Sequence, residues 1–213
     1  MKSIIDLTAP MFDGAPTMPM DPKLSISKHC TLNTLGYNLS RVIMSTHQGT
    51  HLDAPKHFFD KGESVDEIAL TRCITKAVKV DLTGKEPGAA IEPSDLEPFA
   101  DKIELGCSVL LQTGWEKYYP EDAYFSGFPY VSKSLADWFA AKEMKLVGMD
   151  IPTPNGVDWK YVHIKMLSAG ILIVEGLTNM GQLPEKEEFT FYALPLKLKG
   201  CDGSPIRAFA ICN

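Results

Sequence analysis

The chain has few cysteines, fewer basic than acidic residues and no long apolar run, and each shortage narrows what it can be. Its five cysteines are odd in number and scattered, with no C-x-x-C pair, which fits free thiols in a reducing cytoplasm better than a disulfide framework. No basic run exceeds two residues and the net charge is −6, so we expect no nucleic acid partner. We find neither a signal peptide nor an apolar stretch long enough to cross a membrane. Together these shortages predict a cytoplasmic protein.

The remaining composition is that of an ordinary globular protein. Of 213 residues, 45% are hydrophobic and 23% are charged. A chain of this length can bury a sizeable core without disulfides. No repeat, low-complexity segment or linker divides it, so we expect a single domain over residues 1–213.

Three of the five histidines lie within eleven residues, together with an aspartate. Imidazole and carboxylate groups are the ligands of Zn²⁺ and Mn²⁺, and two histidines with one carboxylate leave coordination positions open for water and substrate. An isolated histidine is more often a surface or core residue than a ligand. Four ligand-type side chains at regular offsets are a stronger signal. The cluster consists of His47, His51, Asp53 and His57.

The spacing in this cluster indicates an extended chain rather than a helix. Gln48 stands where the helical zinc motif H-E-x-x-H has its glutamate. Gly49, the β-branched Thr50 and Pro55 also disfavour a regular helix.

In an extended chain, His51 and Asp53 share one face because the side chains repeat every two residues. His47 then lies one step further along that face, and Gly49 lets the backbone approach an ion closely. We therefore expect these three ligands to converge on one metal. His57 follows Pro55, where the chain must bend, and is either a fourth ligand or a free acid/base.

The segment 47–57 resembles the signature H-x-G-T-H-x-D-x-P-x-H of the cyclase family of metal-dependent hydrolases, which includes bacterial kynurenine formamidase and isatin hydrolase. The resemblance implies a divalent-metal amide hydrolase in which His47, His51 and Asp53 bind metal and His57 is the general acid/base. Every fixed position of the signature is matched, by His47, Gly49, Thr50, His51, Asp53, Pro55 and His57.

Patterns of alternation and capping place these motifs on secondary structure. Strand, helix and strand over residues 108–150 predict a βαβ crossover with a parallel pair. We read Gly36-Tyr37 as a turn between two strands, and Ser94 as the cap of a short helix. We predict strands over residues 3–8, 23–30, 37–46, 73–82, 108–115, 145–150, 171–175 and within 189–212, helices over 132–142 and 161–169, and loops over 9–22 and 127–131.

A second group of candidate ligands lies at His163 and Glu175. Glu175 ends an apolar strand, where a charge needs a partner or a metal. Taken alone, Glu175 is an ordinary residue at the end of a strand and His163 an ordinary helix residue. The stretch 163–180 resembles the second block of the family, H-x-x-L-L-x-x-G-I-x-I-x-E-x-L-x-N-L, with Met166 where leucine is common. By this resemblance His163 and Glu175 complete the site, either as ligands of a second metal bridged by Asp53 or as partners of the catalytic water.

The resemblance covers nearly the whole chain, from Ile4 to Ala210. It implies an α/β (mixed α+β) fold, a single domain of the swivelling β/β/α type with a mixed sheet, and a homodimer or higher homo-oligomer. Asp150 also matches a family block, and we interpret it as supporting the turn that follows. Within the loop over residues 9–22, the stretch 15–22 lacks the large aromatic residue we expect of kynurenine formamidases, which puts an aryl formamide substrate in doubt. The methionines of this loop either pack against the body or form a flexible wall of a pocket.

We therefore expect a hydrolase that cleaves a small N-formyl or cyclic amide with one or two Zn²⁺ or Mn²⁺ ions. Two other functions stay open. One is a metal-dependent cyclase or lyase that acts on a small carbonyl compound. The other is a non-catalytic protein in which His47, His51, Asp53 and His57 form a closed structural zinc site, and a free His57 argues against it.

Overall fold

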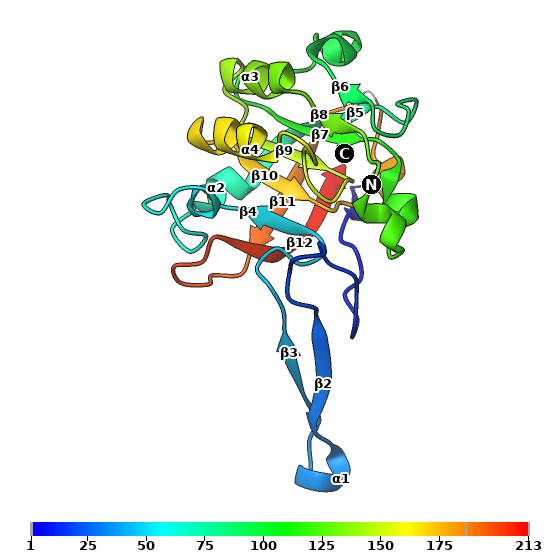
Figure 1. Ribbon diagram of the computed structural model, residues 1–213, viewed down its shortest axis with the longest axis vertical. Coiled ribbons are helices and arrows are strands. Elements are labelled where there is room, and N and C mark those ends of the chain that lie inside the picture. Colours follow the sequence, from blue (N-terminus) through cyan, green and yellow to red (C-terminus); the bar gives the residue numbers. More distant parts are fainter. Residues whose placement is uncertain (1, 186, 213) are drawn as a thin grey trace.

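The protein is built around a mixed sheet, which Figure 1 shows with helices on one side and a long hairpin extending from the other end. The computed structural model describes residues 2–185 and 187–212. Its strands are β1 (Ser3–Asp6), β2 (Ser25–Cys30), β3 (Leu39–Ile43), β4 (His51–Asp53), β5 (Ile74–Asp81), β6 (Ala90–Ile91), β7 (Ser108–Gln112), β8 (Tyr130–Val131), β9 (Leu146–Met149), β10 (Leu172–Glu175), β11 (Phe189–Pro195) and β12 (Gly203–Cys212). The α-helices are α1 (Leu32–Leu35), α2 (Leu70–Cys73), α3 (Lys133–Ala141) and α4 (Trp159–Ser168), and short 3₁₀ helices span Pro55–His57, Pro93–Phe99, Trp115–Tyr118, Asp122–Phe125 and Met180–Gln182.

Seven strands close into a ring. Their order is β12-β11-β5-β7-β9-β10-β4, and β4 pairs again with β12, while β1 extends the sheet beyond β12. The pairs β5–β7, β7–β9 and β9–β10 are parallel, and the other pairs of this sheet are antiparallel. The mixed α+β fold with a mixed sheet is therefore confirmed, and so is the predicted βαβ crossover through α3.

Alternating side chains of the central strands fill two apolar cores. In β7, Val109 and Leu111 belong to the core under α3 and α4, whereas Leu110 belongs to the core on the other face of the sheet. Phe139 of α3 is fully buried in the first core, and Phe191 of β11 in the second. At about 25 cal/mol per Å² of buried apolar surface, these two cores supply the main stabilisation of the ring.

Most predicted elements are present, and the differences have local causes. Ser132 caps α3 as predicted, because its Oγ accepts from the Leu135 N–H at 3.0 Å. The prediction that Ser94 caps a short helix is wrong. Pro93 forces the residue before it into extended geometry, so Glu92 is the cap and the 3₁₀ helix begins after it. The Glu92 N–H donates to Asp95 Oδ2 at 2.7 Å.

Two predictions of irregular chain also need correction. The turn predicted at Gly36-Tyr37 follows the short helix α1, and Gly36 ends that helix in the left-handed region with φ of 80°. The predicted loop at residues 127–131 contains β8, which pairs with β6 in a separate two-stranded sheet. Within the described residues, no helix has the length and apolar character needed to span a membrane.

Residues 23–46 form a long arm that leaves the body (Figure 1). Its strands β2 and β3 pair only with each other in the described residues, and α1 lies at its tip. All five residues of β3 are exposed. The two strands run out from the early loop and return directly into the His47–His57 segment, as the sequence predicted.

Asp150 follows β9 and is fully buried. Its carboxylate accepts from the N–H and Oγ–H of Thr113 and from the N–H of Gly114, at 2.6 to 3.0 Å. It therefore holds the loop after β7 rather than only the turn after β9. Burial raises the pKa of Asp150, these hydrogen bonds lower it, and the net pKa is about 6.

This pKa predicts a pH-dependent contribution to stability. The folded pKa of about 6 lies above the unfolded value near 3.9, so the folded state binds the proton first as the pH falls. Asp150 thus contributes stability that is absent above pH 6 and gained as the pH falls through 6. Urea unfolding should show the wild type gaining about 1 kcal/mol relative to Asp150→Asn between pH 7 and pH 5. A pH-independent difference would contradict this assignment.

Candidate active site

Strand β4 and the turn before it carry three of the predicted metal ligands. His51 and Asp53 share a face of β4, with 3.5 Å between His51 Nε2 and Asp53 Oδ1. His47 lies in the turn, not on an extension of the strand as predicted. Gly49 takes a left-handed φ of 62° in this reversal, and His47 Nδ1 reaches 2.8 Å from Asp53 Oδ1. The three side chains converge, although His47 arrives by a different backbone path.

Helix α4 and strand β10 bring His163 and Glu175 to the same place. Glu175 is opposite His51 in the antiparallel register of β10 and β4. Its Oε2 lies 3.2 Å from His51 Nε2, and its Oε1 lies 3.3 Å from His163 Nε2. The candidate ligands of the two sequence blocks therefore form one cluster.

Backbone carbonyls fix the tautomers of two of these histidines. A carbonyl oxygen can only accept, so the Nδ1–H of His51 donates to Gly49 O at 2.9 Å. In the same way, the Nδ1–H of His163 donates to Trp159 O at 2.7 Å. Each ring therefore turns Nε2 toward the carboxylates, and in the neutral form of this tautomer Nε2 carries the lone pair that binds a metal.

Asp53 stands between the two halves of the cluster. Its Oδ1 faces His47 and His51, whereas its Oδ2 faces His163 Nε2 at 3.7 Å. Among the residues that the structure describes, the buried Oδ2 has no hydrogen-bond partner. A buried carboxylate oxygen without a partner costs free energy that a metal ion would recover.

The charges around these carboxylates shift their pKa values strongly. Burial raises the pKa of Asp53, but His47 and His51 outweigh it and hold the pKa well below its usual range. Burial and Asp53 raise the pKa of Glu175, yet His163 and His51 keep it lowered. Burial lowers the pKa of His47, but Asp53 and Asp202 raise it to about 10. The protein atoms therefore favour two buried anions with positive charge around them, which a divalent cation also supplies.

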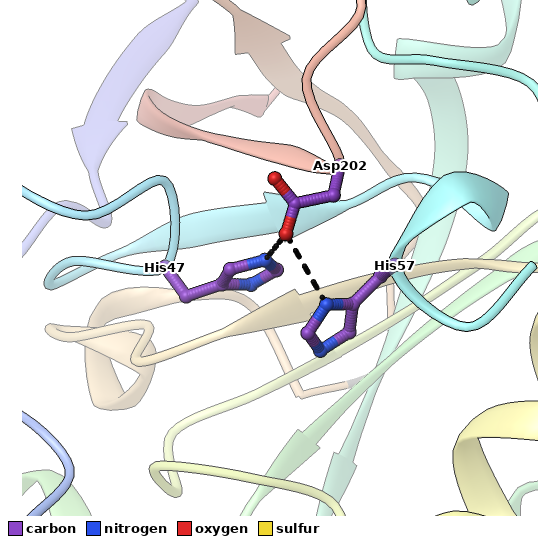
Figure 2. A group of neighbouring side chains, drawn as sticks. All are labelled: His47, His57 and Asp202. Carbon is purple, nitrogen blue, oxygen red and sulfur yellow. Dashed lines mark hydrogen bonds and ion pairs between the residues drawn. The ribbon is translucent and has the colours of Figure 1, made fainter. Parts of the chain in front are cut away.

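His57 ends the 3₁₀ helix that Pro55 begins, at the predicted bend. Its Nδ1 lies 3.4 Å from Asp202 Oδ2, and the same oxygen lies 2.8 Å from His47 Nε2 (Figure 2). Asp202 was not among the predicted site residues; it lies in the Gly-Cys-Asp-Gly stretch of residues 200–203, where β12 begins. A single aspartate in a turn offers no spacing signal in the sequence. Asp202 reaches the site only because β12 pairs with β4, far away in the chain.

The donor set fits a divalent metal. Two triads of ligand atoms, each within 4.8 Å of one another, share Asp53: one is His47, His51 and Asp53, and the other is Asp53, His57 and His163. His47, His57 and Asp202 form a third such triad. Imidazole nitrogens with one or two carboxylates suit Zn²⁺ and Mn²⁺.

Residues of the cluster line a cavity of about 820 Å³. Met18 and Met20 line this cavity, so the early loop forms part of its wall. Aromatic side chains from later elements line it as well, namely Phe58, Tyr119, Tyr124, Phe125 and Trp159.

Known proteins resemble this chain in sequence and in fold. The family model described as "Putative cyclase" matches residues 5–155. Kynurenine formamidase from Bacillus cytotoxicus is 29% identical over 210 residues, covering 96% of this chain and 95% of that protein. A structure described as a predicted metal-dependent hydrolase from Bacillus stearothermophilus is 28% identical, covers 99% of this chain and 98% of its own, and has a TM-score of 0.82. Isatin hydrolase A from Ralstonia solanacearum shares the fold with a TM-score of 0.90, at 22% identity over 100% of this chain and 92% of that one.

The position of Asp53 predicts that metal binding depends on it. Asp53→Asn should lower Zn²⁺ affinity at least ~100-fold, beyond the 10- to 100-fold expected of an outer partner, because it removes a shared ligand. Competition with a chromophoric chelator measures the affinity. The matched control is Asp60→Asn, an exposed carboxylate nearby, which should bind as the wild type does. Undiminished affinity in Asp53→Asn would show that the ion binds elsewhere.

Proposed function

Because the chain belongs to the cyclase family and is an amidohydrolase of that family, we propose that it hydrolyses a small N-formyl or cyclic amide with an aromatic group. The observation that carries the proposal is the position of His57. It lines the cavity next to Asp53 and His163, and its Nδ1 faces the carboxylate of Asp202. A free imidazole nitrogen beside a metal-binding cluster is what amide hydrolysis by an activated water requires.

The aromatic side chains in the cavity wall support the proposal that the substrate carries an aromatic group. Phe58 stacks on His163, with ring centroids 4.8 Å apart, and lies 5.8 Å from the ring of Trp159. These rings come from elements after the early loop. An aromatic wall is therefore in place although residues 15–22 contain no aromatic residue, and we propose an aryl amide as the substrate.

The metal would be held by His47, His51 and Asp53, with Asp53, His163 and Glu175 offering a second position. A bound Zn²⁺ or Mn²⁺ supplies a lowered pKa for its water and polarises the amide carbonyl.

The protein residues supply the proton transfers. His57 accepts the proton of the attacking water through Nε2 while Asp202 accepts the Nδ1–H. His57 then returns the proton to the leaving nitrogen, and the C–N bond breaks. The apolar rings around the site exclude bulk water and strengthen these interactions.

The two rival functions find less support. A closed structural zinc site needs His47, His51, Asp53 and His57 around one ion. Among the described residues no group of ligand atoms contains all four, and the groups with His57 include Asp202 or His163 instead. A purely structural zinc site would also not require the cavity that the cluster residues line. A lyase or cyclase would use the same metal, and assays of lactones beside amides separate the two.

The role proposed for His57 predicts a loss of activity without a loss of metal. His57→Ala should lower kcat about 10²- to 10⁴-fold, which is the rate enhancement that a general acid/base usually contributes. Elemental analysis should find the metal content unchanged. Turnover is measured on N-formylkynurenine and on isatin, with His29→Ala, exposed on β2, as the matched control. Loss of metal in His57→Ala would reassign His57 as a ligand.

We further propose a cytoplasmic homodimer in which the arm, residues 23–46, contacts a second copy. A two-stranded hairpin alone is marginally stable in water. Residues 22–52 contain no acidic side chain and three basic ones, so the rest of the chain carries a net charge of −9. A basic, apolar arm thus complements an acidic body. Six apolar side chains of the arm are about half or more exposed: Leu32, Leu35, Tyr37, Leu39, Val42 and Ile43.

The arm contact predicts a change of assembly when its apolar surface is removed. The double variant Leu39→Ser/Val42→Ser should weaken the dimer at least about tenfold, since each side chain contributes on the order of 1 kcal/mol when buried. Sedimentation equilibrium measures the association. Ile4→Ser, which removes a 71% exposed side chain from the body, is the control and should leave it unchanged. A monomeric wild type would contradict the dimer.

A further inference from the structure

Asp202 contacts both the metal-binding and the proton-transferring parts of the site. Its Oδ2 faces His47 Nε2 at 2.8 Å and His57 Nδ1 at 3.4 Å (Figure 2). Its Oδ1 accepts from the Thr46 Oγ–H at 3.0 Å. One carboxylate therefore contacts the hydroxyl group of Thr46 and the imidazole rings of His47 and His57, all within residues 46–57.

These contacts determine which nitrogen of each ring is free. His47 turns Nδ1 toward Asp53 and Nε2 toward Asp202. If the Nδ1 of His47 binds the metal beside Asp53, its Nε2–H donates to Asp202. For His57, donation from Nδ1 leaves Nε2 with the lone pair that a base needs.

The backbone gives Asp202 no freedom to move away. The Ala54 N–H donates to Asp202 O at 3.0 Å, and the next residue, Gly203, pairs with Asp53 between β12 and β4. A Cβ on Gly203 would lie 2.8 Å from both His47 Cε1 and Leu52 O. The absence of a side chain at Gly203 is therefore what lets this turn lie against His47.

We propose that Asp202 is a positioning residue that orients His47 for the metal and His57 for proton transfer. The inference rests on the proposed function for the role of His57, but its effect on His47 does not depend on turnover. Asp202 thus joins two tasks that the sequence motif assigns to separate histidines. Its loss should weaken metal binding and slow proton transfer together.

The test compares Asp202→Asn and Asp202→Ala with the wild type. Zn²⁺ affinity, measured by chelator competition, should fall about 10- to 100-fold, as for other outer partners of a ligating histidine. Long-range ¹H–¹⁵N spectra of the zinc-loaded protein should show His57 as the Nδ1–H tautomer in the wild type and lose that preference in Asp202→Ala. The kcat should fall while KM changes little.

Asp66→Asn is the matched control. Asp66 Oδ1 accepts from the Gly200 N–H at 2.8 Å, so this variant perturbs the same turn without touching either histidine. It should retain the Zn²⁺ affinity and the His57 tautomer. If it matches Asp202→Asn in both, Asp202 acts only by folding the turn, and the proposal fails.

A second comparison separates the two effects. In a His57→Ala background, Asp202→Asn should no longer lower kcat but should still weaken Zn²⁺ binding. If Asp202→Asn instead removes one bound ion and leaves another at full affinity, Asp202 is a ligand of a site with His47 and His57, which overturns the positioning role. If the wild type turns over neither amide, the proposed function fails, while affinity and tautomer still test Asp202.

Discussion

The structure depends on two buried carboxylates, Asp53 and Glu175, whose side chains meet where β4 pairs with β10. Anions at such a position are unfavourable unless nitrogen donors or a cation surround them. Three histidines from a turn, a strand and a helix meet this need. The closed ring of strands keeps the five groups together, so the same constraint explains both the fold around the site and the arrangement of groups that could hold a metal ion.

The sequence predicted the local part of this arrangement well. His51 and Asp53 share a face because the strand period is two, and Pro55 bends the chain before His57 as expected. His163 and Glu175 were assigned to the site by the family resemblance, because the charge of Glu175 at the end of an apolar strand does not by itself distinguish a ligand from a paired carboxylate, and His163 has no local signal. Asp202 was missed because its place is set by a pairing of strands about 150 residues apart, and no periodicity within the chain reports such a pairing.

The fold shows the same division between local and distant information. Alternation and capping predicted β5, β7, β9, β10, α3 and α4, and the parallel pair followed from the connection through α3. Closure of the ring could not be predicted, because it depends on β4, a strand of three residues that binds both β10 and β12. The exposed apolar residues of β3 were predicted as strand, but their exposure to solvent was visible only in three dimensions.

The closing pair of β4 and β12 also has a consequence for the order of folding. β4 comes early in the chain, whereas β12 begins at Gly203, so β4 and β10 can bring the five groups together before the strand that closes the ring is made. Pairings this distant in sequence form late, since they require the largest loss of chain entropy. Until then Asp53 and His51 lie on an unpaired edge, open to water and to other strands. Pairing with β12 then covers this edge and brings Asp202 beside His47 and His57.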